Sequence, residues 1–150
     1  MKKLMILLAA LAFMAGSCSK DDDDKKLFKM GKDSRPTEWR IPNYNDYEQL
    51  MSVEVQLQDE LQQYASYGDL LCAIIHEEVR GVAEPEQNSD GQWYFSMTIG
   101  SNTANAPILL GYYCEKLRRI YYVDWTNFDM SLPPTGEGPI YKPQFVSVEK

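Results

Sequence analysis

The stretch HEEVRG, from His76 to Gly81, is one residue short of a zinc-protease motif. That motif, H-E-x-x-H on a helix, places two histidines on one face to bind zinc and uses the glutamate as general base. Arg80 stands where the second histidine is needed, and His76 is the only histidine in the chain. The sequence therefore predicts no metal site, and any catalytic triad with a histidine would have to use His76.

The neighbouring carboxylates Glu77 and Glu78 are the next candidates for chemistry. If the segment continues as a strand, His76 and Glu78 share one face and Glu77 lies on the other. A glycosidase needs two converging carboxyl groups about 5–10 Å apart, which adjacent strand residues do not provide. The chain also has no Gly-rich phosphate loop. We therefore expect no enzyme activity, no catalytic residues and no cofactor, with a small hydrolase as the least favoured interpretation.

The N-terminal residues 1–18 are typical of a secretory signal, with Lys2 and Lys3, an apolar run and then small residues. The apolar run, Leu4 to Ala15, has 12 residues, whereas a membrane-spanning helix needs about 20. The end of the segment resembles a bacterial lipobox, which implies that Cys18 is lipidated. Ala15 stands where that motif usually has leucine, so cleavage by ordinary signal peptidase stays open.

Residues 19–37 are polar and acidic, and we expect them to form a solvated, flexible tether. The stretch directly after Cys18 resembles the signal that sends Bacteroidetes-type lipoproteins to the exterior face of the outer membrane. Its residues are Ser19, Lys20, Asp21, Asp22, Asp23 and Asp24. The resemblance implies a protein held at the outer membrane by a lipid on Cys18.

The charge of the chain argues against nucleic acid as a partner. It has 22 acidic and 15 basic residues, a net charge of -7, and an acidic chain repels phosphate backbones. An exported location permits a disulfide between the two remaining cysteines, Cys72 and Cys114. The sequence leaves open whether they pair, because both stand in strand-like segments where a buried thiol is common.

Residues 38–150 read as one all-β domain. Residues 51–58 and 93–100 alternate apolar and polar side chains, the pattern of half-buried strands, with Trp93 among the inward residues. Residues 70–79 form a mostly apolar run that predicts one buried strand, and 105–125 predict a hairpin turning at Glu115–Arg118. Residues 59–69 fit a short helical turn or a loop, and a last strand is expected near 144–148. This succession predicts an antiparallel sandwich or barrel.

The stretch from Tyr67 to Ala83 resembles a module common in Bacteroidetes-type surface proteins, with the pattern G-D-x-x-x-A-x-x-x-x-E-x-R-G-V-A. Ile74 and Val79 depart from the module, which usually has Phe and Cys there. The resemblance covers about residues 39–147 and implies an antiparallel immunoglobulin-like β-sandwich without established catalytic residues. The matching residues include Met51, Val53, Gly68, Asp69, Ala73, Glu78, Arg80, Gly81, Val82 and Ala83.

The E-x-R-G element is then expected to be architectural. Arg80 can pair with a carboxylate such as Asp69 or Glu78. Gly81 can adopt a backbone angle that is closed to other residues.

The expected ligand surface lies near Trp125, which precedes a loop rich in Pro and Gly. A flat aromatic can stack on a sugar ring, and Asp124 or Asn127 can hydrogen-bond its hydroxyls. The sequence thus suggests a weak carbohydrate site formed by Trp125, Tyr121 and Asn127. The alternative is that Trp125 only covers the edge of the core, while Trp39 is expected to pack over an end of the sandwich.

We therefore predict a surface lipoprotein that acts as a non-catalytic binding or adhesion module, with glycans as the candidate ligand. The alternative is a structural or assembly subunit that packs on a partner protein in an outer-membrane complex.

Overall fold

The computed structural model describes residues 35–129 and 139–147 of the chain. The expected signal peptide (1–18), the lipidation site Cys18 and the export residues 19–24 lie outside the described residues. So does most of the expected tether, 19–37.

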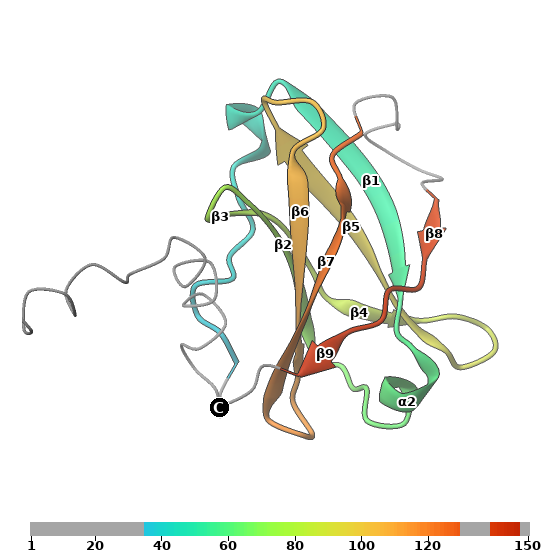
Figure 1. The fold of residues 1–150 in the computed structure, drawn as a ribbon. Coiled ribbons are helices and arrows are strands. Elements are labelled where there is room, and N and C mark those ends of the chain that lie inside the picture. The colour runs from blue at the N-terminus through green and yellow to red at the C-terminus, as the bar shows by residue number, and fades with distance from the viewer. Residues whose placement is uncertain (1–34, 130–138, 148–150) are drawn as a thin grey trace, which may run out of the picture.

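The described residues form two packed β-sheets (Figure 1). The first sheet has the order β4 (Pro85–Gln87), β5 (Trp93–Ser101), β1 (Gln49–Gln56), β8 (Ile140–Tyr141). The second sheet has the order β3 (Glu78–Ala83), β2 (Leu70–Ile75), β6 (Pro107–Cys114), β7 (Arg119–Asn127), β9 (Val146–Ser147). Within the described residues, neighbouring strands of each sheet pair antiparallel, except that β8 runs parallel to β1. The predicted all-β sandwich is confirmed.

The core between the sheets follows the period-two pattern of the sequence. Met51, Val53 and Val55 of β1 point inward, and their register partners on β5 are Ile99, Met97 and Phe95. These side chains pack against alternate residues of the second sheet, namely Leu71, Ala73, Ile75, Leu110 and Tyr112. The predicted inward faces are confirmed, although Trp93 is only partly buried.

The second sheet is also covered on its outer face. Trp39 packs there with Leu70, Cys72 and Ile74, the alternate residues of β2. All six residues of β2 are therefore buried, which explains its continuous apolar run. The expectation that Trp39 covers an end of the sandwich is wrong, because its indole lies on a sheet face.

The remaining elements are short. Helix α2 (Asp59–Gln62) is the helical turn that the sequence allowed, and η2 (Tyr44–Asp46) is a 3-10 turn before β1. The hairpin β6–β7 turns at Glu115–Arg118 as predicted. The last strand, β9, is shorter than expected, and β8 was not predicted. The C-terminal segment contributes one strand to each sheet (Figure 1).

Candidate ligand-binding site

The predicted strand over residues 70–79 is wrong in its second half. β2 ends at Ile75, which pairs with Glu78, so His76 and Glu77 form a two-residue turn into β3. Both turn residues have positive φ angles, 49° and 65°, and both are exposed. Such a turn normally takes Asn-Gly, because those residues tolerate positive φ. His76 and Glu78 therefore do not share a strand face as expected.

Arg80 occupies a β-bulge. Ala73 pairs with Gly81 and Ile74 pairs with Val79, so Arg80 has no register partner on β2. A bulge re-aims the side chain of its extra residue, and the Arg80 side chain is only 11% exposed.

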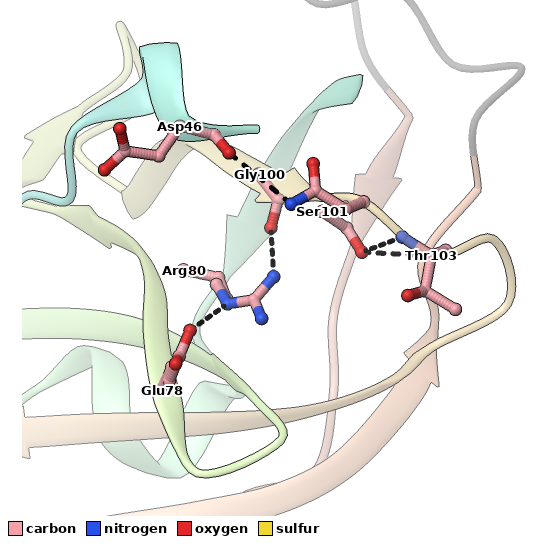
Figure 2. Close-up of polar contacts among 7 residues, drawn as sticks. Asp46, Glu78, Arg80, Gly100, Ser101 and Thr103 are labelled. Carbon is pink, nitrogen blue, oxygen red and sulfur yellow. Dashed lines mark hydrogen bonds and ion pairs between the residues drawn. The ribbon is translucent and has the colours of Figure 1, made fainter. Parts of the chain in front are cut away.

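The Arg80 guanidinium links the two sheets at this bulge. Its Nε donates to Glu78 Oε2 at 3.2 Å, and its Nη1 donates to the carbonyl of Gly100 on β5 at 3.3 Å. It also lies 4.8 Å from the ring centroid of Tyr47. Figure 2 shows the guanidinium between Glu78 and Gly100. Of the two carboxylates predicted for Arg80, the structure selects Glu78.

Asp69 is fully buried and belongs to a different network. Its carboxylate accepts hydrogen bonds from the backbone N–H and hydroxyl of Ser66, from the Tyr112 hydroxyl and from the backbone N–H of Glu115. Burial, and then the nearby Asp69 charge, raise the pKa of Tyr112 far above its ordinary value. Asp69 is architectural in the structure because it ties the segment before β2 to the β6–β7 hairpin.

Gly81 is required for a different reason than expected. Of the described glycines, only Gly91 has a positive φ, so Gly81 needs no unusual backbone angle. A Cβ at Gly81 would lie 2.5 Å from the carbonyl oxygen of Thr98. The glycine allows β3 of one sheet to approach β5 of the other.

A hollow of about 880 Å³ lies where the β2–β3 turn meets β6 and β7. Pockets for small ligands have volumes of about 300–1,000 Å³. β7 has a bulge here, because Asp124 pairs with Leu109 and Asn127 with Pro107. The described lining residues are Ile74, His76, Glu77, Pro107, Ile108, Leu109, Asp124, Trp125, Thr126 and Asn127.

The structure brings together only part of the expected carbohydrate site. Trp125 and Asn127 line the hollow with Asp124, but Tyr121 does not. Tyr121 packs against the core instead, with its ring 6.0 Å from that of Tyr112. Trp125 also packs against the core, edge-on to Tyr141 at 4.7 Å. It therefore covers the core edge, as the alternative interpretation had it, and also lines the hollow.

His76 and Glu77 were not predicted as members of this site. No turn-type residue marks the break between β2 and β3, so the sequence carried no signal that their side chains leave the strand.

The lining of the hollow combines apolar and polar groups. Ile74, Pro107 and Leu109 supply apolar surface, and Thr126 and Asn127 can exchange hydrogen bonds with hydroxyl groups. Lys and Arg are missing from the described lining. This arrangement suits a polyhydroxylated ligand with an apolar face.

Comparison with protein families, curated proteins and solved structures gives no match to this chain. Within the described ranges, no helix is long and apolar enough to cross a membrane. No three His, Cys, Asp or Glu side chains in the described part of the chain lie close enough together to hold a metal ion.

The two described cysteines are free and buried. Cys72 lies on the outer face of the second sheet with Trp39, whereas Cys114 lies in the core between the sheets. Their side chains thus belong to opposite faces, which answers the disulfide question that the sequence left open. Burial raises the pKa of both thiols, that of Cys72 well above its ordinary value.

Proposed function

We propose that this chain is a lipid-anchored protein of the outer membrane that faces the cell exterior and binds glycans without catalysis. The observation that carries the binding role is the hollow, where Asp124, Trp125 and Asn127 meet the β2–β3 turn. Ligands commonly bind at the loops of a rigid sandwich. Glu77 and Glu78 do not form a glycosidase pair, because Glu78 binds Arg80 while Glu77 lines the hollow.

The anchoring part of the proposal rests on Cys18 and the aspartates 21–24. Two or more acyl chains hold a protein stably at a membrane, whereas one does not. The intact mass of the native protein should show acylation of Cys18, and an unmodified Cys18 would refute the anchor. Replacing the four aspartates with alanine should leave the protein anchored but protected from external protease, and equal digestion of both versions would contradict surface display.

The glycan proposal is tested with the mature protein on a glycan array. Trp125→Ala and Asn127→Ala should each weaken binding at least fivefold. Melting temperatures must be measured beside the affinities, because Trp125 also packs on Tyr141. Tyr67→Ala is the matched control, since Tyr67 is 71% exposed and lies outside the hollow lining. A parent protein that binds no glycan, or an Asn127→Ala variant with unchanged affinity, would overturn the proposal.

We infer further that the sandwich is of the immunoglobulin type. Taking β1 as strand B and β2 as strand C, the order β4-β5-β1 matches D-E-B, and β3-β2-β6-β7 matches C′-C-F-G. One departure is that β8, from the C-terminal segment, lies beside β1 and runs parallel to it. A different strand order in a crystal structure of the mature protein would contradict this inference.

A role in assembly is the second candidate, and the described sheet edges favour it. The short strands β8 and β9, each at the end of its sheet, carry exposed apolar side chains, Ile140 at 63% and Val146 at 53% exposure. Edge strands of a sheet can pair with another chain. A pull-down from solubilised outer membranes should then recover a stoichiometric partner, and recovery of the protein alone would count against assembly.

A further inference from the structure

We propose that the β2–β3 turn forms one wall of the glycan site, and that Glu77 and Asp124 make this site select uncharged sugars over acidic sugars. The excluded class comprises uronates, sialates and sulfated sugars. This inference rests on the proposed glycan-binding function and names its ligand class and two further binding residues.

The first step is the placement of the turn relative to β7. Ile74, Leu109 and Asp124 are register partners across β2, β6 and β7, so they form one row on the second sheet. His76 and Glu77 follow at the end of β2, and both line the same hollow as Asp124. β2 and β7 are two strand spacings apart, about 10 Å. Glu77, in the turn after β2, and Asp124, on β7, therefore lie on opposite sides of apolar Leu109 of β6.

The second step is the charge of the lining. Neither Glu77 nor Asp124 forms a hydrogen bond or ion pair through its carboxylate with any described residue, and the described lining contains no Lys or Arg. A ligand carboxylate in the hollow would face two exposed negative charges that no described Lys or Arg of the lining offsets, and like charges repel at these separations. Sugar hydroxyls, in contrast, can donate hydrogen bonds to both carboxylates.

The third step is the backbone of the turn. His76 and Glu77 hold positive φ angles that Asn-Gly would adopt at lower free energy. Unfavourable backbone conformations of this kind concentrate at functional sites. Asn-Gly would thus suit the hairpin better, and the two side chains that stand there instead both line the hollow.

The experiment compares each neutral glycan that the array identifies with the same glycan oxidised at its C6 hydroxyls to the uronate. The parent protein should bind the uronate at least tenfold more weakly at low salt, and added salt should reduce this difference because it screens the charges. The variant Glu77→Gln/Asp124→Asn, which keeps the side-chain shapes, should reduce the discrimination at least threefold. Glu48→Gln/Asp90→Asn removes two exposed charges outside the hollow lining and should leave the discrimination unchanged.

Equal affinity for the neutral and uronate forms would overturn the proposal, as would unchanged discrimination in Glu77→Gln/Asp124→Asn. If the array shows only acidic glycans, the selection is refuted while the proposed glycan-binding function stands. If no glycan binds at all, the proposed function itself fails and this inference fails with it.

Discussion

The hydroxyl of Tyr112 on β6 lies 2.6 Å from Oδ2 of Asp69, in the segment that leads into β2. Tyr112 is also among the largest fully buried side chains, and its ring packs against Phe95 and Phe145. This contact joins the centre of the core to the fully buried carboxylate that holds the β6–β7 hairpin in place.

Tyr112→Phe should reduce the free energy of unfolding by about 1.5–3 kcal/mol, because it removes a buried hydrogen bond to a charged group. Urea unfolding measures the loss. Tyr67→Phe is the matched control, since Tyr67 is exposed, and its change should stay within about 0.5 kcal/mol. Equal losses in the two variants would show that the Tyr112–Asp69 contact does not stabilise the fold.

The same tyrosine predicts a loss of stability at alkaline pH. Burial raises the pKa of Tyr112 in the folded protein above its ordinary value of 10.0. Above about pH 10 the folded state therefore keeps a proton that the unfolded state releases, and stability falls as pH rises. Below pH 10 this contribution is constant. Urea unfolding at pH 9 and pH 11 should show a smaller fall in Tyr112→Phe than in the parent protein, and an identical fall would contradict the prediction.

Arg80→Ala should reduce the free energy of unfolding by about 1–3 kcal/mol, through loss of the hydrogen bond to Gly100 and the contact with Tyr47. Glu78 is 66% exposed, so Glu78→Gln should cost less than about 1 kcal/mol. Arg80→Lys should not restore stability, because an ammonium group cannot reproduce the planar contacts of the guanidinium. Thermal melts test all three variants, and a full rescue by lysine would contradict this account.

Gly81→Ala should destabilise the protein by about 1–3 kcal/mol, because the new methyl group meets a backbone carbonyl of the other sheet. Gly91→Ala is the informative comparison. That position has open space but a φ of 78°, so only backbone strain of about 1 kcal/mol is expected. A larger effect at Gly91 than at Gly81 in denaturant unfolding would show that the sheets can separate easily at β3 and β5.

Replacing His76-Glu77 with Asn-Gly should stabilise the hairpin by about 1 kcal/mol, since both angles then suit the residues. The same change should weaken glycan binding, because two side chains that line the hollow are lost. Arg118→Gly is the control, for Arg118 also has a positive φ, 47°, but lies outside the hollow lining. It should raise the melting temperature without changing glycan affinity. Unchanged glycan affinity in the Asn-Gly variant would show that the β2–β3 turn is not part of the glycan site.

The strands β1 and β5 could be predicted from sequence because each has one buried face. Their apolar and polar residues alternate, so the sequence of each strand shows which of its faces packs against the core. The hairpin at Glu115–Arg118 was predictable for a similar reason, since polar residues interrupt two apolar runs. Together these patterns were sufficient for the all-β sandwich.

The break between β2 and β3 could not be predicted, because β2 is buried on both faces. Its residues do not alternate between apolar and polar, so no change of pattern marks its end at Ile75. The bulges at Arg80 and beside Trp125 depend on the register of neighbouring strands, which are distant in the chain. The requirement for Gly81 comes from Thr98 of the opposite sheet. The hollow likewise exists only where the β2–β3 turn, β6 and β7 meet. These features depend on strand pairing and sheet packing, which join residues distant in the chain, so only the tertiary structure shows them. The burial pattern of a single strand depends on its own residues, so the sequence alone can predict it.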